Sequence, residues 1–268
     1  IVYHTAATAY EGLSVFSPVL VTRNIFEASV TTITAAIRNK VKRIVYCSSM
    51  ARYGHHEEMP YKESYECRPQ DPYGIAKKAG EDVLKNLCDT HGVEYVIAVP
   101  HNIVGPRQKY DDPFRNVMSI MLNRMLQGKQ PIIYGDGEQQ RCFSYIDDCL
   151  YCLNALAFQD NVIGEVINIG PDEEPITINA LAEACANETG LNLDPIHHKD
   201  RPKEVKLAVC SSDKARELLG YKTATNMRQS VKKTAEYIRT RGTKKFQYHL
   251  PLEIINDKTP ETWKNKLI

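Results

Sequence analysis

The sequence predicts an α/β protein built on a doubly wound parallel sheet, and three observations support this fold class. Short apolar runs at 41–49 and 93–100 have the length of buried strands. They alternate with amphipathic segments at 17–40 and 73–90, which are long enough to be helices. Small or polar residues follow the strands, at the edge where open parallel sheets bind ligands.

The first half of the chain is expected to alternate between strand and helix. Residues 1–7 form a short strand followed by small residues. The segment 17–40 opens with Ser-Pro, and proline suits the first turn of a helix. It is followed by a β-branched strand at 41–49, a polar loop, a helix over 73–90 and a buried strand at 93–100.

Beyond residue 106 the pattern changes to shorter elements. The expected elements are a helix at 111–128, a strand and tight turn at 131–137, a strand and helix at 142–158, a strand at 164–170, a helix at 175–190 and a helix opening at 211–221. Thr177 and Gly190 are expected to cap the two ends of the helix at 175–190. The tail from residue 243 has little periodicity, and we interpret it as a surface-wrapping extension.

Neither composition nor charge favours a nucleic-acid or membrane partner. The chain has 268 residues, of which 43% are hydrophobic and 25% charged, and a net charge of +1. Such a balance provides no basic field for nucleic acid. No apolar run reaches the ~20 residues that a membrane span needs, and the first residues lack the basic start of a signal peptide. We therefore expect a cytoplasmic location.

We expect no metal site. The eight cysteines are scattered without the density of a disulfide framework. Cys149 and Cys152 have the spacing of a redox or zinc pair, but they lie in an apolar, helix-like run without a second pair at zinc spacing. We interpret them as structural cysteines in a reducing compartment. The adjacent histidines at 55–56 and 197–198 have no partner cluster, so we interpret them as solvated loop residues.

The stretch DPYGIAKKAG, residues 71–80, raises the question of catalysis. Tyr73 and Lys77 stand four positions apart, and a helix of ~3.6 residues per turn places both on one face. With 15 tyrosines among 268 residues, chance alone supplies such a pair. Ser48 and Ser49 end the preceding strand and favour catalysis over two ordinary helix residues, because serine, tyrosine and lysine can converge on one carbinol.

Serine, tyrosine and lysine are residue types suited to the oxidation of a carbinol. A free tyrosine has a pKa near ~10 and is a poor base at neutral pH. The ammonium of Lys77, together with a cationic nicotinamide, would favour the phenolate and lower that pKa. Tyr73 could then remove a hydroxyl proton as hydride leaves the same carbon, while Ser49 holds the oxygen.

Several motifs together resemble those of one known family. They are VYHTAA (2–7), VKRIVYCSSMARYG (41–54), DPYGIAKKAGE (71–81), PHNIVGPRQ (100–108), PIIYGDGEQQRCFSYIDD (131–148), GEVINIG (164–170) and RPKEVKLAVCSSDKARELLGY (201–221). Their order and spacing resemble those of extended short-chain dehydrogenase/reductases, in the nucleotide-sugar branch of the NAD-dependent epimerase/dehydratase family. The resemblance covers nearly the whole chain to residue 221.

The resemblance implies a catalytic triad of Ser49, Tyr73 and Lys77, with NAD as the cofactor and a UDP-sugar as the substrate. The cofactor contacts that it implies are Ala6, Ala7, Asn24, Ser48, Tyr73, Lys77 and Pro100. The substrate contacts that it implies are Ser49, Asn102, Asn116, Ile132, Tyr134, Arg141, Arg201, Glu204 and Ala208. Arg141 and Arg201 would pair with phosphate oxygens, which suit a forked guanidinium.

On this resemblance, a Rossmann domain is joined to a smaller mixed α/β C-terminal domain that binds the substrate. The NAD-binding domain would comprise 1–108 plus 139–170, the sugar-nucleotide domain 109–138 plus 171–242, and the tail 243–268. The family's Gly-x-x-Gly-x-x-Gly loop, which receives the pyrophosphate, does not occur in the 268 residues. Because residues 1–7 resemble the end of the family's fourth strand, we expect an N-terminally incomplete sheet that lacks about 70 residues and binds NAD weakly.

Two positions separate the possible reactions. Dehydratases of this family resemble one another in an acidic pair where this chain has Met50 and Ala51, and decarboxylases carry a glutamate at the position of Ala51. Without these acids we expect a 4-epimerase. A related oxidoreductase, such as a keto-sugar reductase or another epimerase, stays open, as does a non-catalytic NAD-binding protein of the same fold.

The resemblance also predicts a substrate range and an assembly. Ala208 stands four positions after Glu204, the implied ribose-binding acid, where a small residue leaves room at C2 of the sugar. We therefore expect UDP-N-acetylglucosamine to be accepted along with UDP-glucose. Family members pair the helices equivalent to 19–38 and 73–91, so we expect a symmetric homodimer. The apolar residues that these helices offer are Ile25, Ala28, Val30, Ile33, Ile37, Ala79, Val83 and Leu87.

Overall fold

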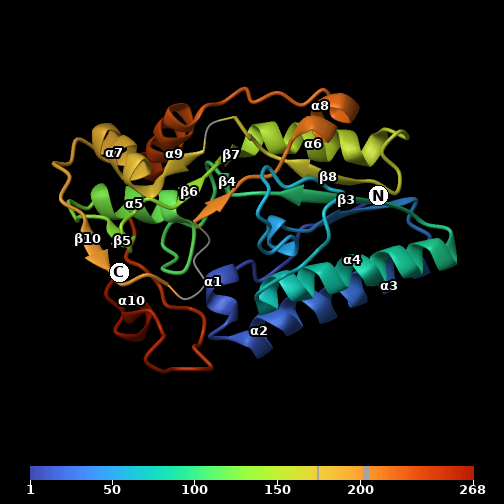
Figure 1. Cartoon of the computed structure of the whole chain (residues 1–268), viewed down its shortest axis with the longest axis horizontal. Coiled ribbons are helices and arrows are strands. Elements are labelled where there is room, and N and C mark those ends of the chain that lie inside the picture. Colours follow the sequence, from blue (N-terminus) through green and yellow to red (C-terminus); the bar gives the residue numbers. More distant parts are fainter. Residues whose placement is uncertain (174, 202–205) are drawn as a thin grey trace.

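The central feature of the fold is a parallel sheet in the order β1-β2-β3-β8 (Figure 1). The structure is a computed structural model that describes residues 1–173, 175–201 and 206–268. The strands of this sheet are β1 (Val2–His4), β2 (Arg43–Cys47), β3 (Glu94–Pro100) and β8 (Val166–Ile169). Each neighbouring pair is parallel, which confirms the predicted fold class.

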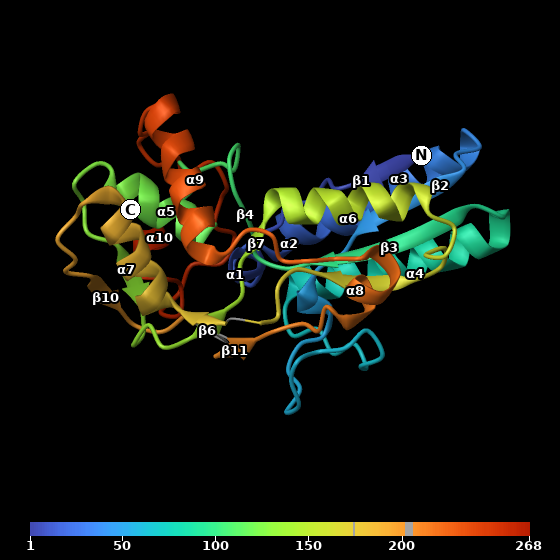
Figure 2. The ribbon, with the colours of Figure 1, turned by 90° about the horizontal axis from the view of Figure 1, so that it is seen from above.

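Helices cover both faces of this sheet (Figures 1 and 2). They are α3 (Ala28–Arg38) and α4 (Pro72–His91) on one face, and α6 (Ile146–Phe158) and α8 (Asp213–Leu219) on the other. Successive side chains of a strand point to opposite faces. Tyr46 therefore packs with α3 and α4, whereas Val45 packs with α6 and α8. The carboxyl ends of the strands stay available for a site.

The segment between β1 and α3 is helical but not regular. It consists of α1 (Glu11–Ser14), α2 (Pro18–Thr22) and a π-helical turn (Arg23–Glu27) that runs directly into α3. The predicted helix at 17–40 therefore begins at its proline, as expected, but changes its hydrogen-bond register midway. π-helical turns are rare in proteins, and those that occur often lie at functional sites.

Helix α4 has defined ends, which lie close to the predicted range of 73–90. Asp71 accepts a hydrogen bond from the backbone N–H of Gly74 at 2.9 Å, and Pro72 occupies the first turn. Gly92 ends the helix in the left-handed conformation, with φ of 67°. These ends place Tyr73 in the first turn of α4.

A second group of elements packs around an apolar core of its own. Its helices are α5 (Val117–Met125), α7 (Ile178–Thr189) and α9 (Met227–Arg241). Its short strands form three small sheets. In the first, β5 (Ile132–Tyr134) pairs with β10 (Ile196–His198), and in the second, β4 (Ile103–Val104) pairs with β7 (Ser144–Tyr145). The third has the strand order β11 (Leu207–Ala208), β6 (Gln140–Arg141), β9 (Ile176–Thr177). Thr177 caps the start of α7 and Gly190 ends it, which confirms both predicted caps.

One prediction for this region was wrong, and another was incomplete. The helix expected at 111–128 begins only at Val117, because Asn116 caps α5 by accepting a hydrogen bond from Met118 N. The tail is not only a surface extension: it contains α10 (Glu261–Lys264), and the buried Trp263 stacks edge-on against Phe114. A single aromatic anchor without periodicity gives little sequence signal.

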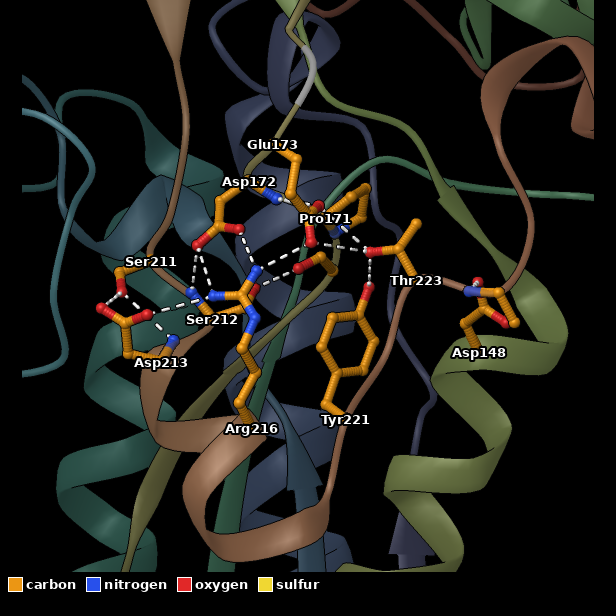
Figure 3. Close-up of polar contacts among 12 residues, drawn as sticks. Asp148, Pro171, Asp172, Glu173, Ser211, Ser212, Asp213, Arg216, Tyr221 and Thr223 are labelled. Atoms are coloured by element: carbon orange, nitrogen blue, oxygen red, sulfur yellow. Dashed lines mark hydrogen bonds and ion pairs between the residues drawn. The ribbon is translucent and has the colours of Figure 1, made fainter.

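A charged cluster joins α8 to the loop that follows β8 (Figure 3). The guanidinium of Arg216 forms ion pairs with Asp172, with Glu173 at 2.8 Å and with Asp213 at 3.1 Å. Asp172 also accepts a hydrogen bond from the backbone N–H of Ser212 at 2.8 Å. This cluster fixes the exit of β8 beside the second group of elements. Among the described residues, no helix has both the length and the apolar character to cross a membrane.

Candidate active site

A cavity of about 660 Å³ lies at the carboxyl ends of the parallel strands. Ala7 follows β1, Ser48 and Ser49 follow β2, and Pro100 ends β3, and all four contribute to its wall. Short strands of the second group of elements line the opposite side. This is the edge at which open α/β sheets bind ligands.

The cavity brings together most of the predicted site residues, which come from distant parts of the chain. Those on its wall are Ala7, Ser48, Ser49, Tyr73, Lys77, Pro100, Asn102, Asn116, Ile132, Tyr134, Arg141, Arg201 and Ala208. Ala6 and Asn24 lie outside the wall; Asn24 instead donates to the hydroxyl of Thr8 at 3.0 Å and braces the loop after β1. Glu204 lies outside the described residues. The individual roles stay predictions.

Tyr73 and Ser49 approach each other because α4 begins against the turn after β2. Ser49 caps the short helical turn Met50–Arg52, and its hydroxyl accepts from Ala51 N at 3.2 Å. Gly74 permits this approach, since a Cβ there would lie 2.7 Å from the carbonyl oxygen of Ala51. The buried Tyr73 is thereby held beside Ser49 on the cavity wall.

Burial dominates the acid–base properties of Tyr73. It raises the pKa of the phenol to about 12, while a hydrogen bond with Ser49 and the positive charge of Arg115 act in the opposite direction. Arg115 also lies on the cavity wall. Sequence reasoning missed it, because a segment interpreted as one helix over 111–128 hid the residue that directly precedes the cap.

Lys77 is buried one turn further along α4. Its Nζ donates to the carbonyl oxygen of Cys47 at 2.7 Å and lies 5.5 Å from the ring centre of Tyr46. Burial lowers the pKa of Lys77 to about 8. The bond to Cys47 fixes the ammonium at the strand end. Among the groups that shift the pKa of Tyr73, the positive charge is that of Arg115. The charge effect expected from Lys77 stays a prediction.

The opposite wall carries cationic, aromatic and amide side chains. The guanidinium of Arg201 lies 5.0 Å from the ring centre of Tyr134. Arg141 stands opposite Ala208 in the pairing of β6 with β11, so both side chains belong to one short sheet. Asn102 adopts a φ of 42° and donates its amide to the carbonyl oxygen of Cys142 at 2.9 Å.

The cysteine and histidine pairs do not form a metal site in the described part of the chain. Cys149 and Cys152 are buried on α6, and burial raises the pKa of both thiols. His56 bonds to the carbonyl oxygen of Glu66 at 2.9 Å, and His197 to that of Gly135 at 2.8 Å. His55 and His56 lie in a loop, as predicted. The loop prediction was wrong for His197 and His198, which lie in β10 and pair with β5.

Comparison with known proteins agrees with this geometry. Residues 1–170 match the model of the NAD dependent epimerase/dehydratase family. The chain belongs to this family. A relative in Methanocaldococcus jannaschii, provisionally named a UDP-glucose 4-epimerase, is 33% identical over 74% of this chain and 64% of its own length. This family member thus spans less than two thirds of that relative.

Solved structures give the same likeness for this epimerase/dehydratase family member. A UDP-glucose 4-epimerase of Thermotoga maritima, solved with UDP-glucose, is 30% identical with a TM-score of 0.84, covering 89% of this chain and 77% of that one. A UDP-N-acetylglucosamine 4-epimerase of Methanobrevibacter ruminantium, in complex with UDP-N-acetylmuramic acid, is 29% identical with a TM-score of 0.83. That match covers 90% of this chain and 76% of the other.

Proposed function

We propose that this protein epimerises a UDP-sugar at C4 by transient oxidation to a keto sugar and return of hydride to the other face. The observation that carries the proposal is the convergence of Ser49, Tyr73 and Lys77 on one cavity. Ser48, Tyr73, Lys77 and Pro100 on its wall fit the nicotinamide end of NAD. When bound, NAD would accept hydride from the sugar carbon and return it.

The chain's own residues would handle the proton and the oxygen. Ser49 would hold the C4 hydroxyl, and Tyr73 would take its proton as the carbonyl forms and give it back afterwards. A phenol with a pKa of about 12 is a weak base until positive charge lies close to it. Arg115 supplies such charge in this structure, and Lys77 stands one turn away.

The lack of an acidic side chain at two positions supports epimerisation over elimination. Met50 and Ala51 line the cavity beside Ser49, at the positions where dehydratases carry their acidic pair. Neither side chain can donate or accept the protons that loss of water needs. Hydride return is then the outcome that the site favours.

The opposite wall supports a sugar nucleotide as the substrate. Arg141 and Arg201 would pair with the diphosphate, and Tyr134 would border the base. The small Ala208 next to Arg141 leaves space for a C2 acetamido group. We therefore propose UDP-glucose and UDP-N-acetylglucosamine as substrates, in agreement with the names of the similar solved structures.

The decisive experiment is turnover of these two nucleotides in the presence of NAD, followed by proton NMR at C4. We expect galacto-configured products without added reductant. Products that form only with added NADPH would favour a keto-sugar reductase, and binding without any product would favour a non-catalytic protein.

Tyr73→Phe tests the catalytic assignment. The change removes only the hydroxyl that the mechanism deprotonates, so turnover should fall by at least about 100-fold, the lower range for a lost acid–base group. The fold, followed by circular dichroism, should stay intact. Tyr3→Phe on the exposed face of β1 is the matched control. Near-normal turnover by Tyr73→Phe would overturn the assignment.

A further inference from the structure

The tail contributes two residues to the wall of the large cavity, and the proposed function assigns them no role. Pro260 and Trp263 lie on this wall together with Tyr134 and Arg201. Both belong to residues 251–263, which we call the strap. The strap runs from the start of α2 to α10, beside β5 (Figure 1). Its contacts at either end indicate what this segment does at the cavity.

At its first end the strap is fixed to the elements that follow β1. The carboxylate of Glu253 accepts the backbone N–H groups of Val19 and Leu20 at 2.9 Å each, at the start of α2. The backbone N–H of Glu253 donates to the carbonyl oxygen of Phe16, also at 2.9 Å. These bonds attach the strap to the part of the molecule that carries the parallel sheet.

At its other end the strap holds Tyr134, the residue expected to border the base. The hydroxyls of Thr262 and Tyr134 form a hydrogen bond with each other. Thr262 has no exposed surface, so this bond is shielded from water. Nδ1 of His198, on the neighbouring strand β10, lies 3.6 Å from the carboxylate of Glu261. Helix α10 is thus joined to both strands of the small sheet formed by β5 and β10.

Trp263 packs between residues from both sides of the cavity. Its ring lies edge-on to those of Phe16 and Phe114, with ring centres 6.1 and 5.5 Å away. A Cβ atom at Gly12 would lie 3.5 Å from Cη2 of Trp263 and 3.8 Å from Nη1 of Arg201. The tryptophan ring and the Arg201 guanidinium therefore approach the same glycine on the cavity wall.

We propose that Thr262 and Trp263 are positioning residues for the nucleotide-binding end of the cavity. The inference rests on the proposed function, which places the base at Tyr134 and the diphosphate at Arg201. Thr262 would fix the orientation of the Tyr134 ring, and Trp263 would limit the movement of the Arg201 guanidinium. Side chains that are held in their binding geometry before the ligand arrives lose less conformational entropy on binding. Because the strap contacts both sides of the cavity, a ligand that bridges them would also stabilise the docked strap.

Fluorescence of Trp263 gives a direct test, because this is the only tryptophan among the 268 residues. UDP is the appropriate probe, since it contains the base and the diphosphate without a sugar. We expect UDP to change the fluorescence of Trp263 saturably, with the same Kd that calorimetry gives. Unchanged fluorescence, while calorimetry detects UDP binding, would overturn the inference and leave the proposed substrate class standing.

Thr262→Val tests the bond to Tyr134 with little change in side-chain size. We expect UDP binding to weaken by about 2- to 10-fold, the range for one neutral hydrogen bond. KM for the UDP-sugar should rise by the same factor with kcat unchanged, because the reacting end of the cavity is not touched. Trp263→Phe keeps an aromatic ring and should bind UDP more tightly than Trp263→Ala. Thr240→Val, whose hydroxyl bonds within the exposed end of α9, is the matched control, and a melting curve checks the fold of each variant.

The outcomes separate the role of the strap from the proposed reaction. A lower melting temperature of Thr262→Val with unchanged UDP affinity would make the bond purely structural and overturn the inference. Weaker UDP binding by Thr262→Val, in a protein that turns over no UDP-sugar, would support the inference and refute the epimerase. No UDP binding by the unaltered protein would refute the nucleotide site and, with it, both proposals.

Discussion

His4 shows how a single side chain ties the first strand to α3 and to the neighbouring strand β2. Its Nε2 hydrogen bonds with the hydroxyl of Ser29 at 2.9 Å, and its ring lies 5.4 Å from that of Tyr46. Burial, with a smaller effect from the charge of Lys77, lowers the pKa of His4 to about 4. The imidazole is therefore neutral in the folded protein at neutral pH.

This pKa predicts how stability depends on pH. In the unfolded chain His4 has its ordinary pKa of 6.5, whereas in the folded protein its pKa is about 4. The stabilisation is thus present above pH 6.5 and is lost as the pH falls towards 4. We expect His4 to lower the free energy of unfolding by about 2 kcal/mol between about pH 7 and about pH 5. Urea denaturation of the unaltered protein and of His4→Gln measures this, and equal pH slopes would contradict it.

Local spacing explains which site residues the sequence could predict. Ser49, Tyr73 and Lys77 lie within one strand–helix unit, so a motif places them together without knowledge of the whole fold. Arg115 and Trp263 reach the same cavity from a loop before a cap and from the tail. Their positions depend on tertiary packing that hydrophobic periodicity does not encode.

At the scale of elements, a buried ion pair joins the end of β2 to α4. Arg52 and Glu81 are both buried, and their charged groups lie 2.9 Å apart. The hydroxyl of Ser48 donates to the same carboxylate. Burial raises the pKa of Glu81, while the charge of Arg52 opposes that rise. The pair therefore holds the turn that carries Ser49 against the helix that carries Tyr73.

Removing one member of this pair should cost more than removing both. Arg52→Met leaves a buried carboxylate unpaired, and Glu81→Leu leaves a buried guanidinium, so each should lower the free energy of unfolding by about 3–5 kcal/mol. The double variant should cost much less than the sum, because apolar side chains can replace a buried pair. Asp82→Asn, in the exposed pair with Lys78 on the same helix, should cost less than about 1 kcal/mol. Additive losses in the double variant, measured in urea, would refute this coupling.

The helices also show which elements hydrophobic periodicity predicts and which it misses. The sequence predicts α7 because Thr177 and Gly190 mark its ends, and it predicts α4 from its amphipathic pattern. The helix at 17–40 contains a π-helical turn that the sequence does not predict, since residue types give no direct signal of the hydrogen-bond register within a turn. Helix α9, which carries a capping box at Asn226 and Gln229, was not predicted despite this signal.

At the scale of the whole molecule, the two expected dimer helices contain residues that cannot all form an interface. Ile25 and Ile33 have no exposed surface, so they pack within their own protomer. Val19 and Ile75, by contrast, are 69% and 53% exposed on α2 and α4. Large apolar side chains so exposed are available for burial by a second copy. The homodimer stays a prediction. We now expect its apolar contact to involve Val19 and Ile75 in place of the buried Ile25 and Ile33.

Light scattering at micromolar concentration should therefore give twice the mass of one chain. The double variant Val19→Asp with Ile75→Asp should give the mass of one chain, because paired carboxylates across a two-fold axis repel each other and cannot be desolvated. Phe158→Asp is the matched control, since Phe158 is 66% exposed at the end of α6, on the other face of the sheet. A single-chain mass for the unaltered protein would refute the dimer. Dissociation by Phe158→Asp alone would place the interface on the other face, against α6.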